Sequence, residues 1–387
     1  MRTGGFNFLE QDRVHFGTPA AQGLRTEADL RGAQRIVVVT SRSLNRHASA
    51  VPQALAEIQP RVVALFDQCV EHTPRASVMA LATLLREARA DLVVSIGGGT
   101  VIDTVKVALV ALAEGLTQPE QLDHWHMRVA PDGSRVVPQP RTPPCRQIAV
   151  PTTLSGAEFS DLGGCTDERH GTKQGYTGAF IGAAAVILDP RITVHTPERL
   201  WLSTGVRAVD HAVEALCSVN AQPLIDATSV RALTLMARSL RRYVQASDDL
   251  DARLDGQLAA WLAATSIRRT EYGASHGLGH ALGADAGVPH GITSCVLLPT
   301  VMRFNAAACG PQLAEVAAAL GDAHTPAADQ IEALIASLGL PTRIGQLGID
   351  RARLPVIAEK ALANPWVRSN PQPLTDVAGV LGVLESA

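Results

Sequence analysis

The first half of the chain alternates between two patterns of apolar residues. Short runs rich in valine and isoleucine, such as Arg35–Thr40 and Asp91–Ile96, flank a segment with helical spacing, Val78–Ala90. Continuous apolar runs of this length are typical of parallel strands that are buried on both faces, and apolar residues three and four apart are typical of helices. The pattern predicts strand–helix–strand units.

Two further apolar runs extend this pattern. Gln147–Val150 and Ala183–Leu188 are each closely followed by proline, which ends a strand. We therefore predict an α/β domain with a mostly parallel, Rossmann-like sheet over residues 1–190. A proline-rich segment, Gln118–Arg146, interrupts it, and we expect a surface excursion or a short hairpin there.

From residue 191 to residue 387 the periodicity is almost entirely helical. One short apolar run, Ser294–Leu298, is strand-like. We predict an all-helical second domain over residues 191–387. Its clearest helical segments are Thr228–Val244, Leu254–Ile267, Pro311–Leu320, Ala328–Leu338 and Leu354–Ala363.

Charge and composition exclude several classes of protein. The formal net charge is −3 with no run of either sign, so we expect neither nucleic acid nor an anionic membrane surface as a partner. Apolar stretches such as Ala179–Leu188 are far shorter than the roughly 18 to 20 residues that span a bilayer. Glu10 and Asp12 interrupt the region where a secretory signal has its apolar core, and the six cysteines have no CxxC spacing. We expect a cytoplasmic protein with a small-molecule partner.

A glycine-rich segment joins a predicted strand to a predicted helix. Gly97, Gly98 and Gly99 are followed by Thr100 and, three residues later, by Asp103. Glycines at such a turn let backbone N–H groups approach a phosphate, and the helix amino terminus favours negative charge. The motif predicts pyrophosphate binding, although its spacing is not that of the GxGxxG fingerprint.

Hydroxyl side chains follow two other strands. Thr152, Thr153 and Ser155 come directly after the Gln147 strand, where the carboxyl ends of parallel strands meet at the ligand crevice. The strand at Arg35–Thr40 ends at Ser41, with no acid of the kind that favours NAD. A corner without an acid allows NADPH and can also accept NADH, so we expect one of these two as the cofactor.

Histidines dominate the helical half. His276 and His280 are four residues apart, hence on one face of a helix, and His290 follows ten residues later. His211 lies further upstream, with Arg207 one helical turn before it. Converging imidazoles predict a metal site or a site of proton transfer.

Taken together, these motifs resemble the iron-containing alcohol dehydrogenase superfamily. The Gly97 motif, the turn at Thr152, the segment around His211 and the histidines from His276 to His290 occur in the order of that family. The resemblance implies the architecture of iron alcohol dehydrogenases and dehydroquinate synthases, a dinucleotide-binding domain followed by a helical domain. It also implies a homodimer.

The metal position departs from the family pattern. Metal-dependent members bind a divalent ion through an aspartate, a histidine four residues later and two further histidines, which correspond here to His211, His276 and His290. The aspartate position holds Arg207. A guanidinium removes the anionic ligand and adds a like charge, so we expect a site without metal.

Maleylacetate reductases are the branch that this chain resembles most. They also lack the acidic ligand, and the branch implies a role in aromatic compound degradation. The resemblance implies that Lys173 and Thr153 orient the nicotinamide and its ribose. We expect positive charge at the site, from protonated imidazoles or from the guanidinium, to stabilise the developing oxyanion or to bind substrate carboxylates. The residues expected to supply it are Arg207, His211, His276 and His290. We expect His280 or a neighbour to return the proton.

The predicted function is a metal-independent, nicotinamide-dependent reductase of a small unsaturated oxo acid such as maleylacetate. A metal-dependent alcohol dehydrogenase or aldehyde reductase, with His211, His276 and His290 as ligands, is the first alternative. An inactive nucleotide-binding homologue is the second. A sugar-phosphate cyclase would need a basic phosphate-binding set that we do not find in the sequence.

Overall fold

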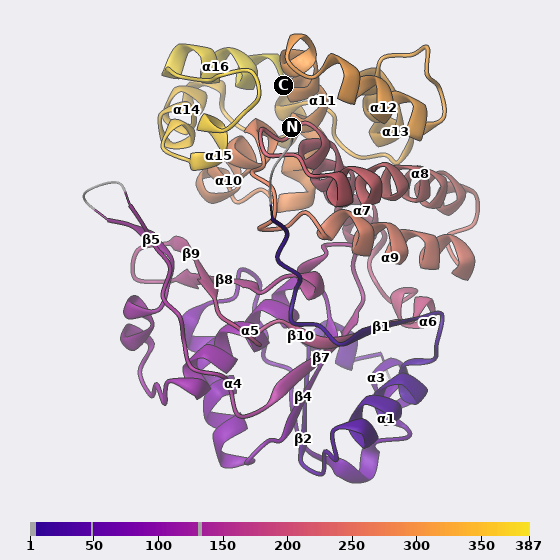
Figure 1. Ribbon diagram of the computed structural model, residues 1–387, viewed down its shortest axis with the longest axis vertical. Coiled ribbons are helices and arrows are strands. Elements are labelled where there is room, and N and C mark those ends of the chain that lie inside the picture. The colour runs from indigo at the N-terminus through magenta and orange to yellow at the C-terminus, as the bar shows by residue number, and fades with distance from the viewer. Residues whose placement is uncertain (1–4, 48, 131–133) are drawn as a thin grey trace. The chain divides into compact units, whose positions relative to one another are not determined.

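The computed structural model describes residues 5–47, 49–130 and 134–387, which form two compact units (Figure 1). One unit is Asn7–Thr196. The other is Pro197–Ala387, together with the described residues that precede Asn7. The sequence placed this boundary at residues 190 and 191. The first unit is an α/β domain and the second is helical, as the sequence predicted.

A six-stranded parallel sheet forms the centre of the first unit. Its spatial order is β1-β10-β7-β4-β2-β3. The strands are β1 (Arg13–Phe16), β2 (Ile36–Thr40), β3 (Val62–Phe66), β4 (Leu92–Gly97), β7 (Arg146–Pro151) and β10 (Ala183–Leu188). Four of them coincide with the predicted apolar runs. The sequence analysis did not identify β1 and β3, which are the two edge strands.

Helices cover both faces of this sheet because successive side chains of a strand point to opposite sides. Ile36 and Val38 of β2 pack in one cluster with α1 (Ala20–Leu30) and α3 (Ala50–Leu55). Val37 and Val39 pack in the other cluster. The helices of that second face are α4 (Arg75–Glu87) and α5 (Gly99–Ala113). Burial on both sides explains why the central strands are apolar throughout.

Short elements complete this unit. The hairpin of β8 (Leu162–Asp167) and β9 (Thr172–Thr177) was missed in the sequence. The proline-rich excursion contains a turn, η2 (Pro119–His124), and a hairpin of β5 (Arg128–Val129) and β6 (Arg135–Val136), while residues 131–133 of the excursion lie outside the described part. The remaining elements are α2 (Arg42–Asn45), α6 (Pro190–Thr193), η1 (Gln59–Arg61) and η3 (Ala157–Phe159).

The second unit contains only helices and turns among its described residues. The strand-like run Ser294–Leu298 lies inside a helix, because a short buried apolar run does not distinguish a strand from a fully buried helix. The long helices are α7 (Glu198–Leu216), α8 (Pro223–Gln245), α9 (Leu250–Ala264), α10 (Ala274–Ala286), α11 (His290–Phe304), α12 (Gly310–Leu320), α13 (Ala327–Ser337), α14 (Leu354–Leu362) and α16 (Val377–Ser386), and α15 (Pro365–Arg368) is a single turn. Among the described residues, no helix combines the length and the apolar character needed to cross a membrane.

Candidate active site

The glycine-rich turn forms a cradle at the carboxyl end of β4. The strand ends at Gly97 and α5 begins at Gly99. A Cβ atom on Gly98 would lie 2.8 Å from Cγ2 of Thr153, and one on Gly97 would lie 2.6 Å from Cγ2 of Val101. Side chains therefore cannot occupy this turn, and the start of a fifteen-residue helix stays open to an anionic group. The residues fit the pyrophosphate of a dinucleotide.

The turn after β7 forms the other wall of the cradle. Gly97 pairs with Pro151, and the Thr152 N–H donates to the Gly97 carbonyl at 3.1 Å. The Thr153 hydroxyl donates to Ser155 Oγ at 3.3 Å. Thr152 and Thr153 are buried, and Thr100 is half-buried at the first turn of α5. The sheet thus brings together two motifs that are about fifty residues apart in the sequence.

Asp103 and Lys173 meet at the β8–β9 hairpin. The Gly164 N–H donates to Asp103 Oδ2 at 3.1 Å. A Cβ on Gly164 would lie 2.6 Å from Lys173 Cε, so the lysine side chain crosses directly over this glycine. Asp103 lies in the second turn of α5, and the side chain of Lys173 from β9 lies near it at Gly164.

Sequence reasoning gave no role to Lys106, which is fully buried in α5. Its Nζ donates to the carbonyls of Ala157 at 2.6 Å and Leu162 at 2.8 Å, and to Ser160 Oγ at 3.2 Å. The ammonium fastens the turn after β7 to α5, so Lys106 supports the shape of the cradle. The sequence feature that could have identified Lys106 is its position three residues after Asp103, on the buried side of the predicted helix.

Ser41 lies at the end of β2, as expected, and its hydroxyl caps α2 by accepting from the Leu44 N–H at 3.2 Å. An acid that sequence reasoning did not consider is close to this corner. Asp67 follows β3, and its Oδ2 accepts from Asn45 Nδ2 of α2 at 2.9 Å. No acid follows β2 directly, as the sequence indicated. The carboxylate of Asp67, which follows the neighbouring strand β3, nevertheless lies close to the end of β2.

In the helical unit, Arg207 is almost completely buried in α7. Its Nη1 donates to Ser294 Oγ of α11 at 3.1 Å and to Asp210 Oδ2 at 3.4 Å. Among the described residues, the hydrogen bonds of this guanidinium all come from Nη1. The side chain is 11% exposed, so its other N–H groups are available to a ligand.

Asp210 is the carboxylate around which these contacts are arranged. Its Oδ2 also accepts from Ser294 Oγ at 2.6 Å and from Ser275 Oγ at 3.0 Å. The structure makes Asp210 the partner of Arg207. The i, i+3 spacing to Arg207 was the signal for this pairing.

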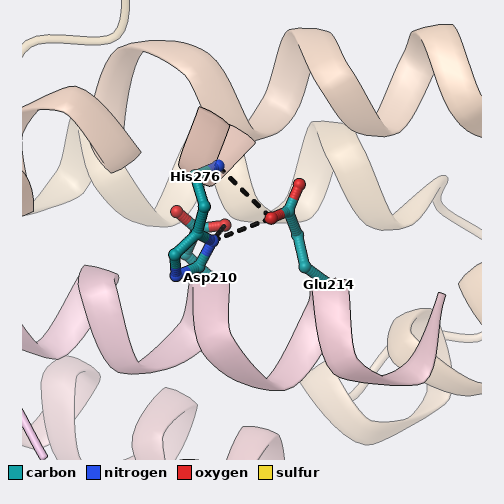
Figure 2. A group of neighbouring side chains, drawn as sticks. All are labelled: Asp210, Glu214 and His276. Carbon is teal, nitrogen blue, oxygen red and sulfur yellow. Dashed lines mark hydrogen bonds and ion pairs between the residues drawn. The ribbon is translucent and has the colours of Figure 1, made fainter. Parts of the chain in front are cut away.

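Glu214, one helical turn after Asp210, holds the amino terminus of α10 (Figure 2). Its Oε1 accepts from the Ser275 N–H at 2.7 Å, and its Oε2 accepts from the N–H groups of Gly273 at 2.9 Å and His276 at 3.3 Å. Oε2 also lies 2.7 Å from His276 Nδ1. A Cβ on Gly273 would lie 2.7 Å from Asn370 Oδ1 and 3.0 Å from Glu214 Oε1, so a side chain at this position would crowd both acceptors. Neither sequence spacing nor composition assigned a role to Glu214.

The predicted histidines converge with two aromatic residues that the sequence analysis missed. The ring of His276 stacks on Tyr272 and His211, with centroids 4.1 Å and 4.9 Å apart. His280 and His290 lie with centroids 5.6 Å apart, and Trp366 of α15 lies 4.9 Å from the His280 ring. A Cβ on Gly277 would lie 2.6 Å from Cγ2 of Val367, which explains how α15 rests directly on α10.

Burial and the charge of Arg207 hold the pKa values of His211 and His276 well below the ordinary histidine value. Both imidazoles are therefore neutral at neutral pH. We expected either protonated imidazoles or a guanidinium as the source of positive charge, and for these two histidines the environment disfavours the first option. Arg207 is the cation of the cluster.

Existing contacts of Asp210 and Glu214 disfavour a divalent metal at the three-residue group Asp210, Glu214 and His276. Donor atoms of Asp210, Glu214 and His276 lie within 4.8 Å of one another, but Glu214 already accepts from three backbone N–H groups and contacts His276 Nδ1. Asp210 is paired with the Arg207 guanidinium. The family positions offer neutral imidazoles beside a fixed cation, without the anionic ligand that would offset the charge of a dication.

Comparisons with known proteins cover nearly the whole chain. A model described as iron-containing alcohol dehydrogenase matches residues 11–190, and one described as the C-terminal part of the Fe-containing alcohol dehydrogenase family matches residues 201–387. Maleylacetate reductase 1 of Rhodococcus opacus is 30% identical over 97% of this chain and 94% of that protein. The probable alcohol dehydrogenase EutG of Salmonella typhimurium is 31% identical over 90% of this chain and 86% of that protein.

A solved structure agrees with these matches. The maleylacetate reductase of Rhizobium sp. strain MTP-10005 has a TM-score of 0.82 and 27% identity, and the alignment covers 100% of this chain and 98% of that one. Two family models together account for both units of the fold. The chain belongs to the iron-containing alcohol dehydrogenase family, an NAD(P)-dependent family of oxidoreductases.

Proposed function

We propose that this protein is an NAD(P)H-dependent reductase of a small unsaturated oxo acid, such as maleylacetate, and that it acts without a metal ion. The observation that carries the proposal is Arg207, a buried guanidinium at the position where metal-dependent members have an aspartate. Its Nη1 is held by Ser294 and Asp210, and its remaining N–H groups are available to an anionic substrate.

Different residues bind the pyrophosphate and the nicotinamide of the cofactor. The cradle at Gly98 and the backbone N–H groups at the start of α5 bind the pyrophosphate, since no side chain fits there. Thr153 and Lys173 orient the nicotinamide end. When bound, the reduced nicotinamide supplies the hydride.

Arg207 supplies the positive charge that a metal would otherwise provide. A guanidinium presents a planar fork of donors that matches a carboxylate, and it keeps its charge in a buried site. Placed beside the carbonyl of an oxo acid, it stabilises the negative charge that develops on oxygen as hydride arrives. Removing one such preorganised donor typically costs a factor of about 10² to 10³ in turnover.

Neutral His211 and His276 complement this cation by hydrogen bonding. In the described chain, His211 Nδ1 and His276 Nε2 are buried without a hydrogen-bond partner. An unpaired buried polar atom costs about 1 to 3 kcal/mol, so a bound substrate that pairs with it gains affinity. His280 and His290 lie beside them and extend the substrate site.

The test combines metal analysis with a substrate screen. Protein purified without added metal is assayed for iron and zinc, treated with a chelator, and tested for NADH and NADPH oxidation against oxo acids, enones, aldehydes and ketones. We expect substoichiometric metal, activity that survives chelation, and a preference for unsaturated oxo acids. Stoichiometric iron or zinc whose removal abolishes turnover would overturn the proposal.

A metal-dependent alcohol dehydrogenase or aldehyde reductase is the second candidate. The unpaired imidazole nitrogens of His211 and His276 favour it, because they could coordinate an ion together with His290. The relative EutG is described as a probable alcohol dehydrogenase. The same experiment distinguishes the candidates, since this one predicts activity with simple aldehydes that is lost on chelation.

The proposed assembly is a homodimer in the cytoplasm, with a carboxylated small molecule as substrate. Light scattering coupled to size-exclusion chromatography measures the mass of the assembly directly. A mass close to twice 40.8 kDa is expected, and a monomer would contradict the proposal.

A further inference from the structure

The β8–β9 hairpin carries Lys173, which the proposed function places at the nicotinamide end of the cofactor, and it lies outside the six-stranded sheet. A two-stranded hairpin is at best marginally stable in water by itself, so its position depends on what it packs against. Strand β8 packs beside α5 (Figure 1). A Cβ on Gly163 would lie 3.0 Å from Val107 Cγ2 and 3.1 Å from Lys106 Cβ. The base of the hairpin therefore rests directly on this helix.

The rest of the hairpin is held by Arg75, the first residue of α4. Its side chain is only 1% exposed. Nη2 donates to Gln174 Oε1 at 2.7 Å and to the Tyr176 hydroxyl at 3.3 Å, both on β9. The same nitrogen lies 3.6 Å from Asp167 Oδ2, at the end of β8. One buried guanidinium thus joins α4 to both strands.

The proline-rich excursion supplies further partners of Arg75. Nη1 donates to the Pro119 carbonyl at 3.0 Å, and Nη2 pairs with Asp123 Oδ1 at 2.7 Å, both in η2. Asp123 also accepts from Arg169 of the hairpin turn at 2.6 Å, and Arg169 pairs with Asp167 at 2.7 Å. Two guanidiniums and two carboxylates therefore balance in charge, and together they connect α4, η2 and the hairpin turn.

The backbone before α4 is held against the hairpin as well. His72 and Thr73 have φ angles of 66° and 53°, which residues other than glycine seldom adopt. Thr166 holds both of them, because its N–H donates to the Thr73 carbonyl at 2.9 Å and its hydroxyl donates to the His72 carbonyl at 2.7 Å. Glu168 accepts from the first two N–H groups of α4 at 3.0 and 3.2 Å. Thr166 is the residue directly opposite Lys173 in the hairpin, so these contacts act beside the lysine.

We propose that Arg75 is a positioning residue, which holds the β8–β9 hairpin in place and thereby fixes Lys173 where it meets the nicotinamide end of the cofactor. The inference rests on the proposed function, in which Lys173 contacts the cofactor. Lys173 and Gln174 are adjacent in β9, so their side chains leave opposite faces of the hairpin. Arg75 binds Gln174 on one face, and on the other face the Lys173 side chain crosses Gly164. Without this support, the ammonium loses its fixed position.

The first test needs neither cofactor nor substrate. The chain contains three lysines, Lys106, Lys173 and Lys360, so a ¹H–¹³C spectrum of full-length protein labelled at lysine Cε has few signals. The Lys173 signal is assigned by its loss in Lys173→Met. In Arg75→Met we expect this signal to narrow and to move toward the position of a free lysine, while the signal of Lys360 in α14 stays unchanged. A Lys173 signal that Arg75→Met leaves unaltered would overturn the proposal.

Two further variants separate positioning from folding. Arg75→Met leaves Asp123 and Asp167 paired with Arg169, so we expect this variant to fold. Arg75→Lys keeps the charge but lacks the fork of donors that reaches η2 and β9 together, so it should restore only part of the wild-type behaviour. Arg86→Met is the matched control. Arg86 also lies in α4, its Nη2 donates to the Leu116 carbonyl at 2.9 Å, and among the described residues it has no hydrogen bond to the hairpin. This control should leave the Lys173 signal and cofactor affinity unchanged.

The second test measures binding by isothermal titration calorimetry. The ligands are the tighter of NADH and NADPH and its adenosine half, ADP or 2′,5′-ADP, which lacks the nicotinamide and its ribose. Loss of a hydrogen bond to a charged group corresponds to a factor of about 10 to 100 in affinity. We expect Arg75→Met to weaken dinucleotide binding by that factor and to leave binding of the adenosine half nearly unchanged.

A double variant links the effect to the lysine. In a Lys173→Met background, Arg75→Met should cause no further loss of dinucleotide affinity, since the two residues act through one contact. Additive losses in the double variant, or equal losses for the dinucleotide and its adenosine half, would overturn the proposal. If the wild type binds neither dinucleotide, the proposed function has failed, and the Lys173 signal still decides whether Arg75 holds the hairpin.

Discussion

Replacing Arg207 by methionine removes the cation of the site and keeps much of the side-chain volume. The change leaves Asp210 buried, with only the hydroxyls of Ser275 and Ser294 as donors. Breaking a buried ion pair by removing one partner costs about 3 to 5 kcal/mol. The Nη1–Oδ2 separation is 3.4 Å and two hydroxyls remain, so we expect a loss near the lower end of that range.

This loss of stability can be separated from the loss of catalysis. A loss of about 3 kcal/mol corresponds to a decrease of about 6 to 12 °C in Tm for a unit of this size. In the double variant Arg207→Met with Asp210→Asn, the uncompensated carboxylate is gone, so most of the stability should return. Turnover should stay about 10² to 10³ lower in both variants, because the donor to the oxyanion is missing in each.

Two measurements decide the matter: thermal unfolding by calorimetry, and kcat/KM for NADPH oxidation with an unsaturated oxo acid. A double variant that is stable and fully active would refute the assignment of Arg207 as the electrophilic group. A single variant with unchanged Tm would show that the Arg207–Asp210 pair contributes nothing measurable to folding.

Three further variants test other parts of the site. Arg207→Asp restores an anion at the family's metal position, so we expect elemental analysis of this variant to find stoichiometric zinc or iron. A variant that gains no metal would show that the ligand positions inferred from the family do not form a metal site in this protein. Gly98→Ala places a Cβ 2.8 Å from Thr153 Cγ2, so NAD(P)H affinity measured by fluorescence should fall about tenfold or more, and unaltered affinity would exclude the cradle as the phosphate site. Gly277→Ala directs a Cβ against the side chain and backbone N of Val367, at 2.6 and 2.9 Å, so overpacking should cost about 1 to 3 kcal/mol in denaturant unfolding; a stable variant would show that α15 can move away from α10.

Local patterns identified most of the fold. The central strands β2, β4, β7 and β10 follow from continuous apolar runs, because a strand buried on both faces needs apolar residues at every position. The edge strands β1 and β3 were missed because each is short and partly exposed, with a mixed pattern. The run Ser294–Leu298 looked strand-like within a region predicted to be helical, because a fully buried helix shows no polar face.

The sequence identified candidate residues where a local motif indicates a chemical role. Three adjacent glycines, hydroxyls after a strand and histidines four residues apart each carry a local signal. Trp366 and Tyr272 carry no such signal, because their contact with the histidines depends on how α15 and the segment before α10 fold back.

The sequence alone determined which groups are present: a glycine-rich turn before a helix, a series of histidines and an arginine where metal-dependent relatives have an acid. The tertiary structure decided the charge and hydrogen-bond state of those groups. Glu214 reaches His276 across sixty-two positions of sequence, and Arg207 is paired with Asp210 and Ser294 in a buried cluster. Burial and neighbouring charge set a pKa, and both arise only when distant segments pack together.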